Sequence, residues 1–385
     1  MPKLTQVMRV TQRSLPALLH LPTKMDNKKY TIDFDQLYDS TRKCKKGVSW
    51  KPSVKSFILN DMENLHRMER QLKNGTWKNG KPRPIKITYP KKRDGLSISF
   101  KDRVYQRCIN DNVLYPSTTR TFIYDNYACQ TGKGPDKARE QVKRMMWRFY
   151  CKYGTDGYVL QTDIKGYYPN MSHTAVKEMF KKYLSPEAYR MTCEVLDDQY
   201  NGEIGYNPGS QMVQIAGITL LNTVDHYIKE RLHARYYTRY MDDGWQLERT
   251  REKLEHDLPL IAQEMEKLGC CLNMDKTRIV PLSKGFTYLG FRYRIADSGK
   301  ITMTVSADNV KHERRKLRKM VQKSRQGKIP KEKVEECYLS WKNHASKGND
   351  KKTIFKMDTY YKRLWRNGNA KPNKKSHADQ AGKRV

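Results

Sequence analysis

The chain has 385 residues and carries 76 Lys and Arg against 41 Asp and Glu, a formal net charge of +35. This excess predicts a polyanionic partner, and nucleic acid is favoured over an acidic membrane because no apolar run approaches the roughly 18 residues of a membrane span. The length allows two or three packed units. The eight cysteines lack metal-ligand spacing, which predicts a reduced cytoplasmic protein without structural zinc. We also expect no signal peptide.

The first 80 residues carry helical patterns, the clearest of which runs from Ser53 to Leu72. Its apolar residues recur on one face at helical spacing: Val54, Phe57, Ile58, Met62, Leu65 and Met68. Residues 81–160 mix strand and helix patterns around a basic turn at 91–95. We expect residues 1–80 to buttress the segment that follows.

Two motifs deliver carboxylates from short strands. Residues 158–162 form an apolar strand that ends at Asp163, and Asp242 and Asp243 lie between aromatic strand formers in the segment 239–247, as in a tight hairpin. Hard cations take oxygen ligands, so Asp163 and Asp242 can bridge two Mg²⁺ ions for phosphoryl transfer. Asp243 points the other way and is a weaker or outer ligand. The motifs indicate a metal-dependent nucleotidyl transferase.

A second Asp pair serves as an internal control. Asp197 and Asp198 end a predicted helix that begins at Ser185-Pro186, where solvated acids are ordinary. We interpret this pair as structural surface.

The later segments are mainly helical. A helix is predicted from Gln211 to Leu232 with Ser210 as its N-cap, and a second from 250 to 268, where Pro259 should kink or restart it before Gly269. Basic helical runs follow at 307–325 and 331–346, and the polar residues 374–385 are predicted to form a disordered tail.

Together these motifs resemble, in order and spacing, a reverse transcriptase of the bacterial retroelement type. The resemblance covers residues 80 to 295 and rests on segments 100–106, 127–134, 163–168, 209–211, 240–243, 272–277 and 286–291. Within the family the chain is most similar to enzymes of diversity-generating retroelements and to related phage-defence reverse transcriptases, on Ser210-Gln211, Tyr127-Ala-Cys and 340–344. Gln130 stands where an arginine is usual, and 205–209 lacks the usual Pro-x-Gly.

The resemblance implies an α+β right-hand polymerase fold. Its parts would be an N-terminal helical extension (1–80), fingers (81–160), a palm with an antiparallel sheet (161–300), a basic helical thumb (301–373) and the tail (374–385). The implied activity is RNA-directed DNA synthesis by two-metal phosphoryl transfer. It would use two Mg²⁺, with Mn²⁺ as a substitute, held by Asp163, Ile164, Asp242 and Asp243.

The resemblance also implies roles for single residues. Tyr168 would pack against the sugar and favour dNTPs, Gln211 would contact the templating pair, and Lys276 would act as general acid toward pyrophosphate. Further nucleotide contacts are implied for Lys92, Arg93 and Arg103. Template or primer contacts are implied for Lys91, Gly132, Lys133, Gly134, Ser210, Tyr288, Leu289, Gly290, Trp341 and His344.

Plainer interpretations stay open for several of these residues. Tyr168 could be a core aromatic residue, Gln211 a surface residue and Lys276 a solvated charge. Residues 288–290 could be a buried strand, and Trp341 and His344 could make a packing contact between helices. The alternatives for the whole chain are an RNA-dependent RNA polymerase, which Tyr168 disfavours, and a catalytically inactive RNA-binding scaffold, which the intact acids disfavour.

The implied partners are a template RNA, expected to be a cognate non-coding RNA, a DNA primer or cDNA, dNTPs and an accessory protein, without a membrane. The implied setting is the cytoplasm, with the chain encoded by a bacterium, phage or prophage.

Overall fold

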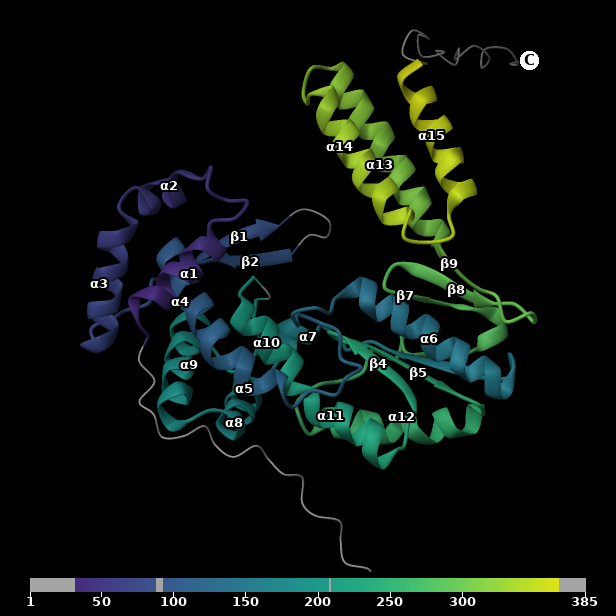
Figure 1. Ribbon diagram of the computed structural model, residues 1–385, viewed down its shortest axis with the longest axis horizontal. Helices are drawn as coiled ribbons and strands as arrows, with labels where there is room; N and C mark the ends of the chain where they lie inside the picture. The colour runs from purple at the N-terminus through teal and green to yellow at the C-terminus, as the bar shows by residue number, and fades with distance from the viewer. Residues whose placement is uncertain (1–31, 88–92, 208, 367–385) are drawn as a thin grey trace, which may run out of the picture. The chain divides into compact units, whose positions relative to one another are not determined.

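The chain folds into two compact units, which are described separately. The computed structural model describes residues 32–87, 93–207 and 209–366 (Figure 1). Unit 1 contains the described residues up to Gly132 together with Ile164–Arg231 and Leu260–Asn273. Unit 2 contains Lys133–Asp163, Leu232–Pro259 and the described residues from Met274 onward.

Unit 1 is mainly helical and has one two-stranded antiparallel ribbon, β1–β2. Its elements are α1 (Phe34–Cys44), α2 (Pro52–Leu59), α3 (Asp61–Lys73), β1 (Arg83–Ile87), β2 (Arg93–Ser97), α4 (Phe100–Ile109), η1 (Asn110–Leu114), α5 (Tyr115–Thr119), α7 (Tyr167–Asn170), α8 (His173–Tyr183), α9 (Pro186–Gln199), α10 (Gln211–Leu220), α11 (Asn222–His226) and η2 (Tyr227–Arg231). The central helix is α10, whose residues are nearly all buried against α4, η1 and α8.

The single helical pattern predicted from Ser53 to Leu72 is two helices. The backbone of Asn60 leaves the helical region at φ −126° and ψ 38°. The helical periodicity of α2 therefore does not continue into α3. As a result Val54 and Leu65 are buried, whereas Met62, predicted on the same face, is 54% exposed.

Unit 2 is built on two antiparallel sheets, β4-β5-β3-β6 and β7-β8-β9. Its elements are α6 (Pro135–Tyr153), β3 (Tyr158–Thr162), β4 (Tyr236–Tyr240), β5 (Asp243–Glu248), β6 (Arg278–Pro281), η3 (Leu282–Lys284), β7 (Phe286–Tyr288), β8 (Phe291–Ile295), β9 (Ile301–Val305), α13 (Ala307–Arg325), α14 (Lys331–Ala345) and α15 (Lys351–Arg366). The helix α12 (Arg251–Glu266) has residues in both units.

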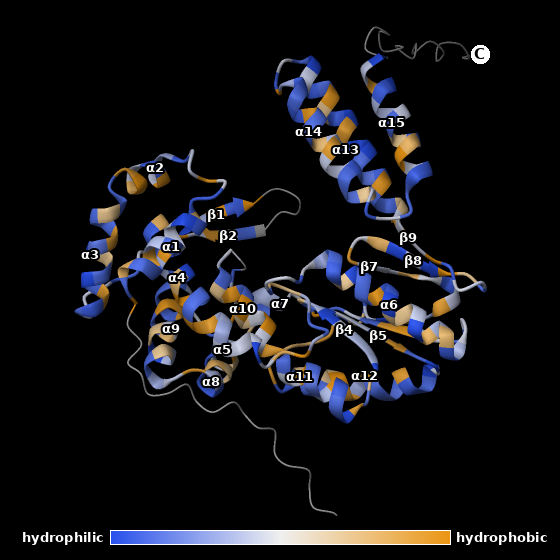
Figure 2. Cartoon of the chain, in the orientation of Figure 1, coloured by the Kyte–Doolittle hydropathy of each residue, from blue (hydrophilic) through white to orange (hydrophobic). Residues whose placement is uncertain are grey.

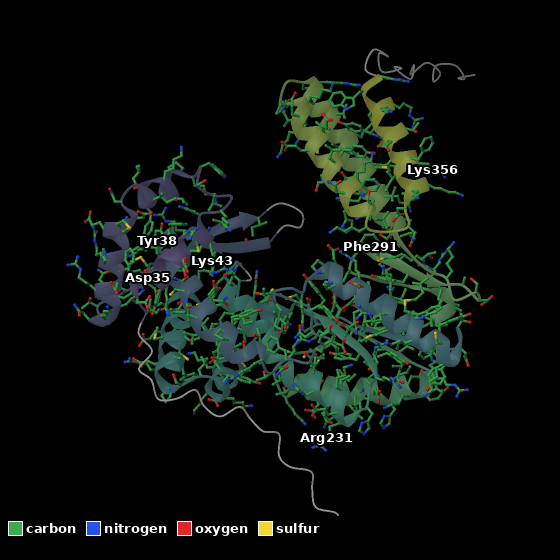
Figure 3. The ribbon with its side chains drawn as sticks, in the orientation of Figure 1. Asp35, Tyr38, Lys43, Arg231, Phe291 and Lys356 are labelled. Atoms are coloured by element: carbon green, nitrogen blue, oxygen red, sulfur yellow. The ribbon has the colours of Figure 1, made fainter. Side chains whose placement is uncertain are left out.

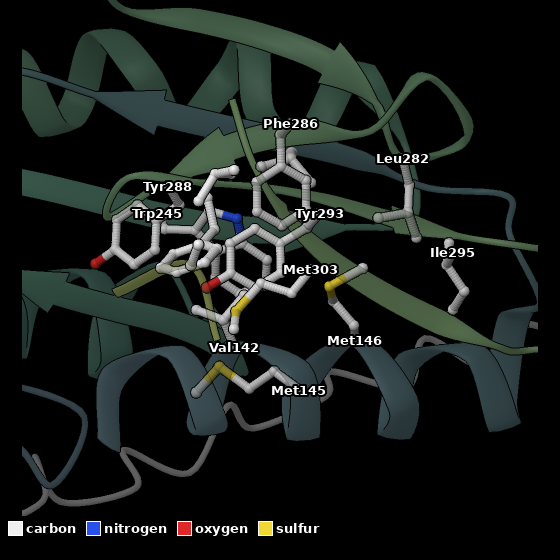
Figure 4. Packing of buried hydrophobic residues seen from close by; sticks show 14 of the residues in the cluster. Val142, Met145, Met146, Trp245, Leu282, Phe286, Tyr288, Tyr293, Ile295 and Met303 are labelled. Carbon is white, nitrogen blue, oxygen red and sulfur yellow. The ribbon is translucent and has the colours of Figure 1, made fainter. Parts of the chain in front are cut away.

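One aromatic core joins the parts of unit 2. Trp245 of β5 is fully buried, and the rings of Phe286 and Tyr293 stack with centroids 5.1 Å apart. Figure 4 shows Val142 and Met146 of α6 in the same cluster. Burial of each large apolar side chain contributes about 1.5–3 kcal/mol, so this core fixes α6 and both sheets as one body.

The predicted fold class, α+β with an antiparallel sheet, is confirmed. The strand before Asp163, the hairpin at 239–247 and the helices at 307–325 and 331–345 form as predicted. The predicted helix 211–232 has its Ser210 cap but is divided into α10, α11 and η2, because the backbone leaves regular helix at Leu221. The helix predicted from 250 to 268 forms as α12 and continues through Pro259, so the helix is not restarted there. The alternative, a kink at Pro259, stays a prediction.

Two elements near the C-terminus are not anticipated by the sequence patterns. β9 pairs with β8, and α15 packs on α13. The boundaries proposed for fingers, palm and thumb stay predictions, and the tail 374–385 lies outside the described residues. Within the described segments, no helix combines the length and apolar character needed to cross a membrane.

The close approach of β3 to β5 predicts a specific pair of variants. A Cβ at Gly244 would overlap Thr162 Oγ1, so Gly244→Ala should destabilise unit 2 by about 1–3 kcal/mol. Thr162→Ala removes that oxygen and should restore most of the loss in the double variant. Chemical denaturation of the four proteins measures the coupling; additive losses would contradict this account.

Candidate active site

The β4–β5 hairpin places Asp242 and Asp243 at its tip. Tyr240 pairs with Asp243 across the hairpin, and Met241 takes the left-handed conformation at φ +56° that closes the turn. The guanidinium of Arg239 is buried and its Nη1 donates to the Met241 carbonyl at 2.6 Å. A tight turn and a buried cation therefore fix the positions of both carboxylates.

Asp163 follows β3, the strand next to β5 in the same sheet. Thr162 pairs with Gly244, one residue beyond Asp243, which puts the end of β3 beside the start of β5. The backbone nitrogen of Asp163 donates to Thr277 Oγ1 at 3.5 Å. Lys276 lies next to that threonine, and its Nζ is 2.9 Å from Asp163 Oδ2 and 3.2 Å from Oδ1.

The three carboxylates influence one another electrostatically. Burial raises the pKa of Asp243 to about 6, and the negative charges of Asp242 and Asp163 add to the rise. Burial also raises the pKa of Asp242, with a further contribution from Asp163. The hydrogen bond to Asp163 raises the pKa of Lys276, whose ammonium opposes both increases. The cluster thus holds more negative charge than its single lysine balances.

The chemistry of this cluster fits a hard divalent cation, because its donors are all carboxylate oxygens. Among the residues that the structure describes, no three His, Cys, Asp or Glu side chains are arranged to hold a metal ion by themselves. Asp163 is turned to Lys276. The carboxylates that would hold a cation are Asp163, Asp242 and Asp243.

The β7–β8 turn contains the predicted residues 288–290 and contacts the hairpin. Tyr288 is buried, and its hydroxyl donates to the Asp243 carbonyl at 3.4 Å. Leu289 and Gly290 form the turn with φ of +45° and +82°. The Leu289 carbonyl accepts from Arg139 Nε of α6 at 3.2 Å.

Tyr168 and Gln211 belong to unit 1. The Tyr167 hydroxyl donates to the Gly217 carbonyl of α10, and a Cβ at Gly217 would lie 3.1 Å from Tyr168 Cε1. Both rings therefore pack on the one residue of α10 that has no side chain. Gln211 is exposed at the first turn of α10.

Ser210 and Arg103 belong to the same unit. Ser210 caps α10 by accepting from Met212 N, and its hydroxyl donates to Gln106 Oε1 at 2.7 Å. Arg103 is half-buried on α4.

The remaining predicted residues are dispersed. Gly132, which has a φ of +74°, belongs to unit 1. Lys133 and Gly134 precede α6 and belong to unit 2. Trp341 is buried and its Nε1 donates to Asn309 Oδ1, and His344 packs on Phe291 at 4.7 Å. Their nucleic-acid roles stay predictions beside these packing contacts. Lys91, Lys92 and the side chain of Arg93 lie outside the described residues.

Two supporting arginines were missed by the sequence analysis. Arg239 stands three residues before Asp242, and no role was predicted for it from the sequence. Arg139 is 7% exposed and lies 4.9 Å from the Phe291 ring. The burial of Arg139 could have been predicted from the sequence, because this residue shares a helical face with Val142 and Met146. A cation on an apolar face indicates a buried partner.

The internal control behaves as predicted. Asp197 forms an exposed ion pair with Lys177, and Asp198 accepts from Asn79 at 2.9 Å at the end of α9.

The site and its sheet define a class of protein: carboxylates from adjacent antiparallel strands, held beside a lysine, are typical of template-directed nucleotidyl transferases. Residues 89–293 match the model of the family described as reverse transcriptase (RNA-dependent DNA polymerase). Because this match covers more than half of the chain, the chain belongs to the reverse transcriptase family. The predicted resemblance to reverse transcriptases is confirmed at the level of the family, and the bacterial retroelement type stays a prediction.

Solved structures give weaker matches. The chain is 13% identical to an apo telomerase from Candida tropicalis over 58% of this chain and 48% of that one, with a TM-score of 0.45. It is 12% identical to telomerase from Candida albicans in complex with a telomeric RNA fragment, over 75% and 55%, with a TM-score of 0.44. It is 15% identical to the RNA-dependent RNA polymerase of a human picobirnavirus, over 56% and 42%, with a TM-score of 0.39.

The chain spans about half the length of these three proteins. No curated protein sequence matches the chain.

The crowded carboxylates predict a pH-dependent stability. The folded pKa of Asp243 lies above its ordinary value of 3.8, so its favourable contribution is full below pH 3.8 and is lost as pH rises through about 6. Asp243→Asn should therefore raise the free energy of unfolding at pH 7.5, by at most about 3 kcal/mol, and leave it nearly unchanged near pH 4. Denaturant titrations in a chelating buffer measure this. Asp198→Asn is the matched control, and an equal effect of Asp243→Asn at both pH values would reject the crowding account.

Proposed function

We propose that this protein is an RNA-directed DNA polymerase that makes cDNA by attack of a primer 3′-hydroxyl on the α-phosphorus of a dNTP. The observation that carries the proposal is the electrostatic cluster of Asp163, Asp242 and Asp243 on adjacent strands, in a chain of the reverse transcriptase family. Two strands that carry acids to one place support phosphoryl transfer, whereas a scaffold has no need of mutually repelling carboxylates.

Two Mg²⁺ ions, for which Mn²⁺ can substitute, would be held by Asp163, Asp242 and the Ile164 carbonyl, with Asp243 as a weaker or outer ligand. When bound, they would supply activation of the hydroxyl and charge neutralisation on the triphosphate. The protein's own contribution is positioning, because the Arg239 contact and the Thr162–Gly244 pairing fix the acids before substrate arrives.

Lys276 is proposed as the general acid for the leaving pyrophosphate. Its side chain is 62% exposed while its Nζ contacts Asp163, so it can exchange that contact for a phosphate oxygen. Its proton would pass to a pyrophosphate oxygen as the bond between the α- and β-phosphates breaks. The hydrogen bond to Asp163 raises the pKa of Lys276, so the side chain carries its proton before the substrate arrives.

Tyr168 is proposed as the residue that selects dNTPs. Its ring is held against Gly217, so it cannot retreat toward α10 to admit a 2′-hydroxyl. Gln211, exposed at the start of α10, is proposed to contact the templating pair, and Tyr288 to Gly290 the primer end.

We further propose that the enzyme works in a bacterial or phage setting, in a diversity-generating retroelement or a phage-defence system. Its template would be a cognate non-coding RNA, and an accessory protein would assist it. The resemblance of 127–129 and 210–211 to such enzymes supports this role, and sequencing of the copurifying RNA and cDNA tests it.

Loss of one carboxylate should abolish synthesis without abolishing RNA binding. Asp242→Ala removes an inner ligand and should lower dNTP incorporation by about a thousandfold or more, while RNA affinity stays the same. Primer extension and filter binding on the same preparations measure the two properties. The matched control is Asp197→Ala, which should retain full activity. No synthesis by the unaltered protein on any primer, with RNA binding intact, would favour the inactive scaffold.

Sugar selection should depend on the Tyr168 ring. Tyr168→Ala should raise the kcat/KM for rNTPs relative to dNTPs by about tenfold or more, because the obstacle to the 2′-hydroxyl is gone. Tyr167→Phe, which removes only the hydroxyl bonded to Gly217, is the control and should leave the ratio unchanged. Single-nucleotide incorporation measures the kcat/KM ratio of rNTPs to dNTPs for each variant. Equal ratios for the two variants would contradict the proposal that Tyr168 selects dNTPs.

A further inference from the structure

A basic and aromatic groove lies between α13 and α15 of unit 2. Its volume is about 490 Å³. Its lining includes Arg314, Arg318, Phe355, Lys356, Tyr360 and Arg363. Figure 2 shows hydrophilic and hydrophobic residues interspersed along these helices, and Figure 3 shows Lys356 on α15. No role in the chemistry proposed above uses this groove.

Four cations line the groove and no acid does. The acids nearest in sequence are engaged elsewhere, since Asp358 contacts Tyr338 and Lys342, and Glu313 contacts Lys316. Within the described segments none of the four cations forms an ion pair with a carboxylate. Cations gathered without a counter-charge repel one another, so their arrangement favours an anionic ligand.

The aromatic residues of the groove fall into two kinds. Tyr360 is already covered, because the guanidinium groups of Arg314 and Arg363 lie 5.2 and 5.9 Å from its ring centroid and its hydroxyl donates to the Arg314 carbonyl. Phe355 is 73% exposed and leaves an apolar ring face beside the cations. The held Arg314 is preorganised to contact phosphate, and the exposed Phe355 can accept a planar group.

This combination selects one class of ligand. Phosphates require the cations, and a free ring face can stack on a base only where that base is not already stacked in a duplex. We propose that the α13–α15 groove binds an unpaired segment of RNA, with phosphates on Arg314, Arg318, Lys356 and Arg363 and one base on Phe355. The choice of RNA over DNA rests on the proposed function, whereas the groove's chemistry does not depend on catalysis.

The stacking contact is tested with Phe355→Ala in the full chain. Affinity for a short unstructured RNA should fall by about 5- to 150-fold, the range for loss of one base–aromatic stack, while affinity for a blunt RNA duplex stays the same. Leu339→Ala, a truncation of another exposed apolar side chain on α14, is the matched control. Equal losses for Phe355→Ala and Leu339→Ala, or an equal loss on duplex, would overturn the proposal.

The phosphate contacts are tested by salt dependence. Arg318→Gln combined with Lys356→Gln should reduce the slope of log affinity against log salt by about 1.4, since each single-strand phosphate contact contributes about 0.7. Lys319→Gln with Lys323→Gln changes two exposed cations of α13 outside the groove lining and should leave the slope unchanged. Equal slopes for the two double variants, or tighter binding of DNA than of RNA of the same sequence, would overturn the assignment.

The test separates this inference from the polymerase proposal. Binding is measured in the Asp242→Ala background as well, where synthesis is absent and the Phe355 effect should persist. If the wild-type protein makes cDNA but Phe355→Ala binds RNA normally, the groove proposal alone fails. If Phe355→Ala weakens RNA binding but the wild-type protein makes no DNA, the polymerase proposal alone fails.

Discussion

The burial of neighbouring carboxylates, to which their mutual repulsion adds, is the constraint around which unit 2 is arranged. Asp163, Asp242 and Asp243 raise one another's free energy in the folded state, and Lys276 balances only part of their charge. Such a cluster persists only if the backbone that carries it cannot relax. The aromatic core around Trp245 and the buried guanidinium of Arg239 provide that support.

Two glycines stand at positions where a larger side chain would crowd its neighbours. Gly244 lets β5 approach β3 so closely that a methyl group would overlap Thr162, and Gly217 admits two tyrosine rings to α10. At both places the missing side chain allows a closer approach than any other amino acid would permit. Gly217 thereby costs helix propensity within α10, about 1 kcal/mol relative to alanine, in exchange for the position of Tyr168.

The sequence predicted those parts of the fold and site whose signals are local. Strand formers on both sides of Asp242 predicted the hairpin, and the Ser210 cap and the two helices α13 and α14 follow from short-range patterns. Contacts between distant residues gave no such signal: the break at Asn60, the pairing of β9 with β8, and the Arg139 contact to Leu289 depend on tertiary packing. The sequence predicted that the three carboxylates act as a group. It did not predict the ion pair between Lys276 and Asp163, because these two residues are distant in the chain.

The β7–β8 turn is held in place by two contacts, which bears on the proposed primer role. Arg139 of α6 donates to the Leu289 carbonyl, and the hydroxyl of Tyr288 donates to the Asp243 carbonyl. A turn held by these two contacts is a fixed support. Under the primer contact proposed above, the product strand would slide over this support, and each new 3′ end would return to the same distance from the hairpin as the one before it.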